Sequence, residues 1–245
     1  LSDFETLKKN AGIGVVPFEN IVESVRSIKD SFEIAAIRKA GRIANKALKQ
    51  TLKYIKPGIT ENELAGILDL EIRRLGSTNS FHTIVAFGAN ASRPHHLPGS
   101  RKLKKNDTVL IDFGARYKGY CCDMTRCLAI GRPSELYTKV YEAVKNAQAA
   151  AIKMIKGGAD IREVDTAARK AIAGCGLPVY GHGTGHGIGL EVHELPRIAP
   201  ENNRGRLRPG NTVTIEPAVY IPGRLGVRIE DDVLVTSNGC KILSI

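Results

Sequence analysis

The sequence predicts a single α+β domain made of two similar halves, each with two helices followed by an antiparallel hairpin. A pattern of helix, stop and new helix occurs at residues 55–63 and again at 155–163. A turn that leads into a strand ending in a carboxylate occurs at residues 103–112 and again at 207–216. Self-similarity of this kind predicts a repeated structural unit. We therefore expect pseudo-twofold symmetry, with the hairpins joined into one curved antiparallel sheet backed by helices.

The helices of the two halves are predicted by the same signals. Apolar residues recur at three- and four-residue intervals between residues 34 and 55, which predicts an amphipathic helix. After a glycine stop, Thr60 and Glu63 have the spacing of a capping box, and the helix that follows ends at Gly76. The second half repeats these features at residues 140–151, Asp160, Glu163 and Gly176.

Each half then continues into a strand rich in β-branched residues and a return strand. The first strand ends at Asp112 and the chain returns to Asp123, and the second ends at Glu216 and returns to Glu230. Side chains alternate between the faces of a strand, so antiparallel pairing can set the two acids of each hairpin side by side. Acids that only cap or pair on the surface would not need this duplicated placement. Because like charges repel, a bound cation is the simplest reason for it.

Residues 182–194 concentrate three of the six histidines of the chain among glycines. Glycine disfavours regular structure and lets a ligand approach the backbone, and imidazole is the commonest nitrogen ligand of metals. We expect an irregular segment that forms a site, rather than a polar turn with solvated histidines. Together with the four acids, His186 would complete an oxygen-rich set that suits Mn²⁺, Fe²⁺, Co²⁺ or Zn²⁺ and is large enough for two ions.

Composition excludes several other classes of protein. The chain has 245 residues, of which 42% are hydrophobic and 25% charged, and no apolar run or basic leader predicts a membrane span or a signal peptide. A cytoplasmic location is therefore expected. The five cysteines lack the spacing of a zinc or disulfide framework and are expected to be reduced, with Cys122 notable for its place beside Asp123. The net charge of +11 is weakly clustered and aromatic residues make up 5%, so nucleic-acid binding is not expected.

Taken together, these residues resemble the metallopeptidases with the pita-bread (creatinase/aminopeptidase) fold, in the aminopeptidase P and prolidase (Xaa-Pro peptidase) branch. The segment 182–194 is similar to the signature of that branch throughout its length, and residues 80–86 with 94–98 are similar to its substrate-side segment. The resemblance implies that residues 26–245 form the catalytic metallopeptidase domain. It also implies that residues 1–25 are a linker or the remnant of an absent N-terminal domain.

The resemblance assigns a role to each candidate residue. It implies metal ligation by Asp112, Asp123, His186, Glu216 and Glu230. It places His95, His182 and His193 on the substrate side, with Glu216 moving the proton, and it makes Tyr220 and Arg228 outer supports of the metal site.

The function that the resemblance implies is cleavage of the peptide bond before proline, by a hydroxide that bridges two divalent ions. Manganese is the first expectation, with cobalt, zinc and iron also suited to the site. Aminopeptidase and dipeptidase action both stay open, as does assembly of the full-length protein into a homodimer. The substrate would be a proline-containing peptide. The alternatives are a non-catalytic binding module for protein or nucleic acid, and another hydrolase of the same fold such as a methionine aminopeptidase.

Overall fold

The computed structural model describes residues 2–12, 14–201 and 205–244. Residues 1 and 13 of the expected linker, and residues 202–204 and 245 of the expected catalytic domain, lie outside this description. Its helices are α1 (Ser2–Asn10), α2 (Ile21–Arg26), α3 (Ser31–Thr51), α4 (Glu61–Arg74), α5 (Glu135–Met154) and α6 (Ile161–Gly174), with 3-10 turns η1 (Leu52–Tyr54) and η2 (Gly88–Ser92). Its strands are β1 (Thr78–Asn79), β2 (Ile84–Phe87), β3 (Thr108–Phe113), β4 (Ala115–Tyr117), β5 (Tyr120–Cys121), β6 (Met124–Ala129), β7 (Gly185–Gly187), β8 (Glu194–Ile198), β9 (Thr212–Ile215), β10 (Ala218–Ile221), β11 (Leu225–Arg228), β12 (Asp231–Thr236) and β13 (Gly239–Ile242).

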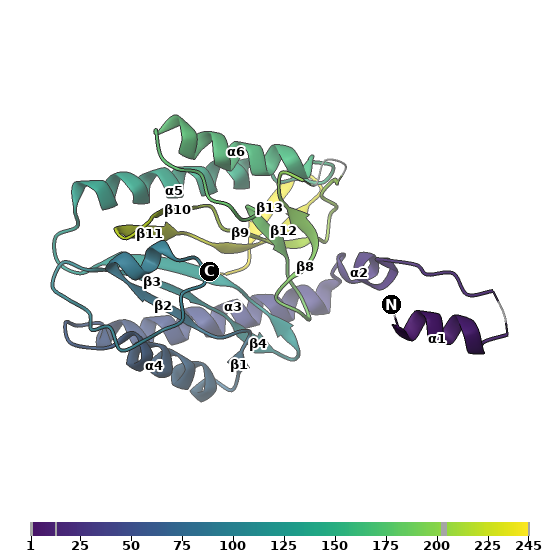
Figure 1. Cartoon of the computed structure of the whole chain (residues 1–245), viewed down its shortest axis with the longest axis horizontal. Helices are drawn as coiled ribbons and strands as arrows, with labels where there is room; N and C mark the ends of the chain where they lie inside the picture. The colour runs from purple at the N-terminus through teal and green to yellow at the C-terminus, as the bar shows by residue number, and fades with distance from the viewer. Residues whose placement is uncertain (1, 13, 202–204, 245) are drawn as a thin grey trace.

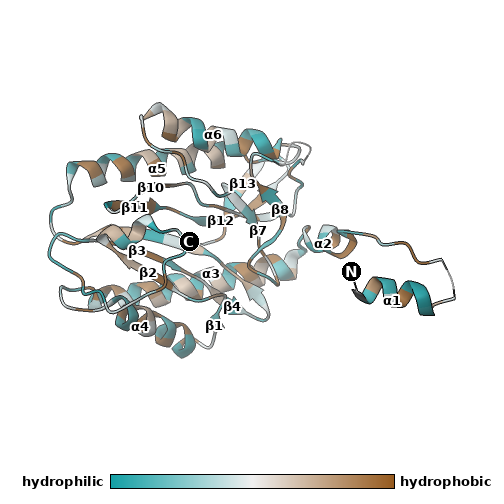
Figure 2. Cartoon of the chain, in the orientation of Figure 1, coloured by the Kyte–Doolittle hydropathy of each residue, from teal (hydrophilic) through white to brown (hydrophobic). Residues whose placement is uncertain are grey.

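The helices pack in pairs on opposite sides of the strands. Helices α3 and α4 cover one side, and α5 and α6 cover the other (Figure 1). Each pair has its own apolar core, and the helices show the alternating apolar and polar bands of amphipathic elements (Figure 2). Leu64, Leu68 and Ile72 of α4 are fully buried, which contributes roughly 1.5–3 kcal/mol for each side chain. The prediction of an α+β fold with two paired halves is confirmed.

The repeat extends to individual backbone hydrogen bonds. The Gly58 amide donates to Leu103 O (2.9 Å), and the Gly158 amide donates to Leu207 O (2.8 Å). Both glycines have positive φ angles, of 101° and 83°, which residues with a side chain rarely adopt. The two helix stops are therefore fixed to the strand entrances in the same way.

The two helix starts differ in one respect. Thr60 and Glu63 form the predicted capping box, with Glu63 N to Thr60 Oγ1 at 3.1 Å and Thr60 N to Glu63 Oε2 at 2.8 Å. In the second half Asp160 caps its helix by accepting from the amide of Arg162, one residue earlier than a capping box requires. The prediction of a second capping box through Glu163 was therefore wrong. The predicted helix ends at Gly76 and Gly176 are confirmed, since both glycines have positive φ just after α4 and α6.

The strands form four antiparallel ladders, in the orders β1-β4-β5, β2-β3-β6, β10-β11 and β13-β12-β9-β7-β8. Hydrogen bonds join the halves where the ladders meet. The Glu230 amide donates to Thr125 O (3.3 Å), and the Cys127 thiol donates to Arg228 O (3.3 Å). The carboxylates of the two hairpins are thereby brought to one place between the helix pairs.

Residues 2–12 and 14–25 extend from this body, with α1 well separated from it in Figure 1. Val16, Phe18, Val22 and Val25 are exposed there, whereas α2 lies close to β8. The assignment of residues 1–25 as a linker or domain remnant stays a prediction. Within the described part of the chain, the helices are too short or too polar to cross a bilayer.

Candidate functional site

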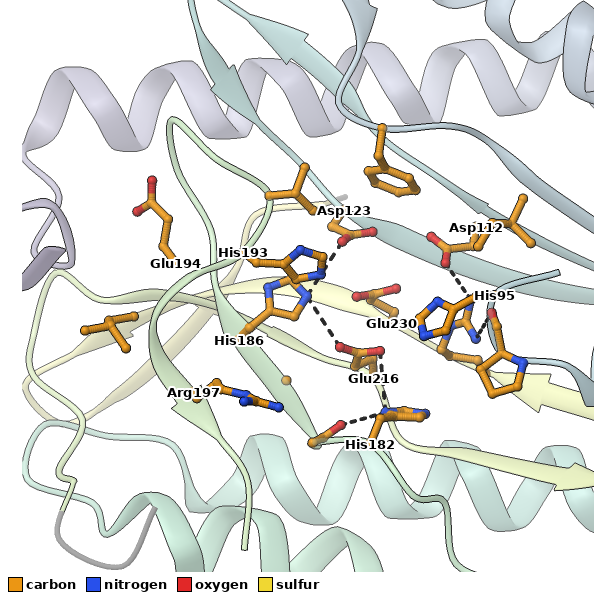
Figure 3. A pocket seen from close by; sticks show the side chains of 18 of the residues that line it. His95, Asp112, Asp123, His182, His186, His193, Glu194, Arg197, Glu216 and Glu230 are labelled. Carbon is orange, nitrogen blue, oxygen red and sulfur yellow. Dashed lines mark hydrogen bonds and ion pairs between the residues drawn. The ribbon is translucent and has the colours of Figure 1, made fainter. Parts of the chain in front are cut away.

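A pocket of about 620 Å³ lies where the two halves meet. Nine of the ten residues that the sequence singled out line it: His95, Asp112, Asp123, His182, His186, His193, Glu216, Arg228 and Glu230. Figure 3 shows the acids and His186 gathered in the middle of this pocket, with His95 and His193 on opposite sides of them. The tenth residue, Tyr220, hydrogen-bonds both to His182 and to Arg228.

The strand registers explain how the acids meet. Ile215 pairs with Asp231 and Ala218 with Arg228, so the same register continued between these pairs sets Glu216 opposite Glu230. Asp112 pairs instead with Thr125, so Asp123, two residues earlier, is its diagonal neighbour on the same face. The two hairpins thus share a plan but differ in register, which the sequence repeat does not reveal.

The carboxylates repel one another in this buried place. Burial, followed by repulsion from Glu230 and Asp112, raises the pKa of Asp123 well above its usual range. Burial and repulsion from Glu216 and Asp112 raise the pKa of Glu230 in the same direction. Burial raises the pKa of Glu216 to about 8, against the opposing charge of Arg228. The cluster is therefore strained electrostatically unless a positive charge lies among its members.

His186 shows most clearly what the cluster is built to hold. Burial lowers the pKa of His186 to about 4, so its imidazole is neutral near pH 7. Its Nδ1 lies 3.0 Å from Gly187 O, and because a carbonyl only accepts, Nδ1 carries the hydrogen. Nε2 then presents a lone pair to Glu216 Oε1 (3.4 Å) and Asp123 Oδ2 (3.8 Å). A nitrogen lone pair facing two carboxylates is the arrangement expected of ligands around a shared cation.

Two further observations show that the residues fit a metal centre. Ligand atoms of Asp123, His186 and Glu230 all lie within 4.8 Å of one another. Buried Oδ1 atoms of Asp112 and Asp123 have no hydrogen-bond partner, although buried polar atoms are normally paired. The donor set of four carboxylates and one imidazole suits first-row divalent ions.

Arg228 connects the acid cluster to His182 through Tyr220. Its guanidinium donates to Asp112 Oδ2 (2.5 Å), to Thr125 Oγ1 (3.0 Å) and to Tyr220 Oη (2.6 Å). Thr125 Oγ1 donates in turn to Glu230 Oε2 (2.7 Å). The predicted outer support by Tyr220 and Arg228 therefore has a geometric basis in these contacts.

His182 is held in one tautomer by the same network. Its Nδ1 donates to Gly183 O (2.7 Å), so in the neutral ring Nε2 accepts from the Tyr220 hydroxyl (3.2 Å). Burial lowers the pKa of His182 to about 4, which keeps the ring neutral. Glu216 Oε2 lies 3.8 Å from His182 Nδ1, so this carboxylate faces His186 with one oxygen and His182 with the other.

The glycines between the histidines are required by close packing. Residues 185–187 form β7, between β9 and β8 in the five-stranded ladder, so the expectation of an irregular segment was wrong for these three residues. A Cβ atom on Gly185 would lie 1.9 Å from Thr214 O, and one on Gly187 would lie 2.1 Å from Leu195 O. Glycine here allows neighbouring backbones to approach closely while His186 projects into the pocket.

A buried network on α6, which the sequence analysis missed, holds the backbone beside His182. Arg169 donates to Tyr180 O (2.8 Å) and His182 O (2.6 Å), and its Nε donates to Asp165 Oδ2 (2.7 Å). Asp165 also accepts from the Thr184 hydroxyl (2.7 Å). The spacing of Asp165 and Arg169, four residues apart on a helix, was the signal available in the sequence.

Glu61 holds the segment that carries His95 in a similar way. This fully buried carboxylate accepts from Phe87 N (2.8 Å), Asn90 Nδ2 (2.8 Å), His96 Nε2 (2.8 Å) and Gly99 N (3.1 Å). Burial alone would raise the pKa of Glu61, but the hydrogen bonds, led by that from His96, lower it. Residues 87–99 are thereby tied to the start of α4.

Replacing Glu61 by Ala is expected to lower the free energy of unfolding by about 3 kcal/mol, because four buried donors lose their acceptor. Since the folded pKa of Glu61 is depressed, its stabilisation is present above the ordinary pKa of 4.5 and is lost as the pH falls through the folded value. Urea unfolding at pH 7 and pH 4 measures both effects. The exposed Glu163→Ala variant is the control, and an equal, small effect of both substitutions would contradict the prediction.

Comparisons with known proteins are consistent with the geometry. The model of Metallopeptidase family M24 matches residues 35–237. An uncharacterized peptidase of Bacillus subtilis is 42% identical over 232 residues, which are 94% of this chain and 65% of that protein. The chain thus spans slightly less than two thirds of the length of this relative.

Two solved structures with closely similar folds are those of an Xaa-Pro dipeptidase and an X-Pro aminopeptidase. A Xaa-Pro dipeptidase from Bacillus anthracis superimposes with a TM-score of 0.95 and 40% identity, covering 99% of this chain and 69% of its own. An X-Pro aminopeptidase from Thermotoga maritima superimposes with a TM-score of 0.93 and 37% identity, covering 100% and 70%. The fold class predicted from the resemblance is confirmed by these similarities.

Proposed function

Because this chain belongs to metallopeptidase family M24, we propose that it is the catalytic part of a dinuclear hydrolase that cleaves the peptide bond before proline. The observation that carries the proposal is the arrangement around His186. Its lone pair faces buried carboxylates, and three further histidines line the same pocket. The similarity to solved structures of an Xaa-Pro dipeptidase and an X-Pro aminopeptidase supports the choice of an Xaa-Pro bond.

The ligands we assign are Asp112, Asp123, His186, Glu216 and Glu230. Two divalent ions held there would lower the pKa of water and polarise the peptide carbonyl. Manganese is proposed first, and cobalt, zinc and iron suit the same donors. Manganese as the native ion, a homodimeric full-length protein and a cytoplasmic location stay predictions.

Glu216 is the group placed to move the proton. One of its oxygens faces His186 at the metal cluster, and the other faces His182 on the pocket wall. It can therefore take a proton from the attacking water as the oxygen bonds to the carbonyl carbon. It can then deliver that proton to the proline nitrogen as the carbon–nitrogen bond breaks.

The three pocket histidines are proposed to hold the scissile group. Burial lowers the pKa of His193, so near neutral pH its ring offers an uncharged N–H donor. His193 and His95 approach the acid cluster from opposite sides in Figure 3, which suits donors to the carbonyl oxygen and its developing charge. His182 lies with Phe81 and Ile84 in the pocket lining and would contact the proline ring.

Substrate length is tested with matched peptides after loading with Mn²⁺, Co²⁺ or Zn²⁺. Hydrolysis of Ala-Pro alone identifies a dipeptidase, and release of the first residue from Ala-Pro-Ala identifies an aminopeptidase. Arg197 lines the pocket and could pair with the carboxylate of a dipeptide, so Arg197→Met would selectively impair Ala-Pro cleavage. Hydrolysis of neither peptide with any of the ions would refute the proposal, and cleavage of Met-Ala-Ser alone would favour methionine removal.

The α6 network gives a further prediction for this reaction. Arg169→Met should lower kcat/KM for an Xaa-Pro substrate about tenfold, because the backbone that carries His182 loses two hydrogen bonds. Arg162→Met on the exposed side of the same helix is the control. Steady-state kinetics with equal metal loading measure the effect, and equal kcat/KM in the two variants would show that Arg169 is not needed.

A further inference from the structure

The loop between β7 and β8 has two faces. His193 lies beside His186, with ring centroids 4.3 Å apart, and belongs to the pocket. The next residue, Glu194, also lines the pocket, but its carboxylate points away from the acid cluster (Figure 3). Its side chain is nevertheless only 5% exposed. Two consecutive residues therefore connect the acid cluster to a buried contact at the edge of the pocket.

That contact is a pair of ionic hydrogen bonds from a distant part of the sequence. Lys29 Nζ lies 2.8 Å from Glu194 Oε2, and Arg26 Nη2 lies 2.6 Å from Glu194 Oε1. The Lys29 side chain is 1% exposed, so its ammonium is withdrawn from water together with the carboxylate. Burial alone would raise the pKa of Glu194, but its hydrogen bonds, first that from Lys29, lower it and favour the ionised form.

Hydrogen bonds fix the backbone that carries the two cations to the segment before β9. The Lys29 amide donates to Gly210 O (2.9 Å), and Asn211 Nδ2 donates to Ser27 O (2.8 Å). Ile28 and Asn211 form an antiparallel bridge immediately before β9. Because β9 leads directly to Glu216, these backbone contacts link the two cations to the acid cluster.

The loop is shaped around this ion pair. A Cβ atom on Gly189 would lie 2.8 Å from Glu194 Oε2 and 2.9 Å from Lys29 Cε, so a side chain at this position would have to displace the ends of the paired side chains. Gly189 O also accepts from Cys121 N (2.7 Å), two residues before Asp123. The loop is thus fixed both to Lys29, through Glu194, and to the first carboxylate hairpin.

We infer that Lys29 and Arg26 are positioning residues that act through Glu194 to hold the His193 loop in the geometry needed for cleavage. The inference rests on the proposed function, because His193 is assigned there to the scissile group. It also extends that function to residues near the start of α3, which no motif of the sequence joins to the site. A displacement of the order of 1 Å in such a group can cost about 100-fold in rate.

The test compares Glu194→Gln, Lys29→Met and the double variant with wild type. Glu142→Gln is the matched control, since Glu142 lies on α5 away from this ion pair and its side chain is 53% exposed. In Glu194→Gln the buried Lys29 ammonium loses its partner, and in Lys29→Met the Glu194 carboxylate keeps Arg26 as its cationic partner. Both single variants are expected to unfold at lower urea concentration, whereas the double variant, which removes both of the buried charges, recovers much of the lost stability. The double variant therefore separates positioning from folding.

The readouts are kcat and KM for an Xaa-Pro dipeptide, bound metal, and hydrogen exchange of the amides in residues 189–194. For the double variant we expect kcat to fall about 30-fold, with KM within about threefold of wild type, unchanged metal content and faster loop exchange. The control should match wild type in all four. A double variant with wild-type kcat overturns the inference. If wild type itself releases no proline, the proposed function fails, and loop exchange then decides: unchanged protection overturns the positioning role as well.

Discussion

Replacing Glu216 by Gln is expected to lower kcat for an Xaa-Pro dipeptide by roughly 1,000-fold, within the range attributed to a positioned acid or base. The amide keeps the shape of the side chain but cannot accept the proton of the attacking water. It is also a weaker metal ligand than a carboxylate. Both consequences follow from the position of Glu216 between His186 and His182.

The measurement is proline release at saturating substrate, with the metal content of each sample determined in parallel. Glu142→Gln on α5, whose side chain is 53% exposed, is the matched control and should retain wild-type kcat. A Glu216→Gln variant that binds two ions and keeps wild-type kcat would exclude Glu216 as the proton carrier.

The second large effect is a strong dependence of metal affinity on pH. In the metal-free chain the pKa of Glu216 is raised to about 8, and those of Asp123 and Glu230 are raised well above their usual values. Below about pH 8 Glu216 holds a proton, and the raised pKa values of Asp123 and Glu230 also favour their protonated forms, so an incoming cation must displace protons. The apparent Kd for Mn²⁺ should therefore fall about tenfold per pH unit for each proton displaced.

Calorimetric titration with Mn²⁺ at pH 5.5, 6.5 and 7.5, in two buffers of different ionisation enthalpy, gives both the Kd and the number of protons released. Glu216→Gln should release fewer protons than wild type, because one titrating carboxylate is missing. An affinity independent of pH over this range would contradict the electrostatic account of the cluster.

The same groups set the sign of a stability effect. Since the folded pKa of Glu216 is raised from 4.5 to about 8, its contribution favours folding of the metal-free chain below pH 4.5 and is lost as the pH rises through 8. Bound metal offsets the repulsion, and at 100 times its Kd it adds about 2.7 kcal/mol. Urea unfolding with and without Mn²⁺ should therefore show the largest difference at the alkaline end.

The sequence predicted those parts of the fold that depend on local chemistry. The apolar periodicity of α3 and α5, the capping box at Thr60 and the glycine stops at Gly76 and Gly176 all act within a few residues, and the structure confirms them. The capping box expected at Asp160 failed because an N-cap side chain can accept from either the second or the third amide of the helix, and spacing alone does not choose between them.

The candidate site was predictable to a different extent. The acids could be grouped because each lies near a strand end in a repeated hairpin, but the register that separates Asp112 and Asp123 diagonally depends on pairing across the sheet. The strand at Gly185–Gly187 has no side-chain pattern typical of a strand, since its place is set by close approach to Thr214 and Leu195. Lys29 and Glu194 are 165 residues apart, so only the tertiary fold brings them together.

The proposed function requires that the pocket hold two divalent ions and that these residues then cleave an Xaa-Pro bond. The most direct measurement strips the chain of metal, adds Mn²⁺ in steps, and follows bound Mn²⁺ and proline release from Ala-Pro in the same samples, with His186→Ala as the comparison. With a dinuclear site, proline release is expected to rise to a plateau at two bound ions per chain and to stay at background in His186→Ala. Full proline release by the metal-free chain, or undiminished release by His186→Ala, would contradict it.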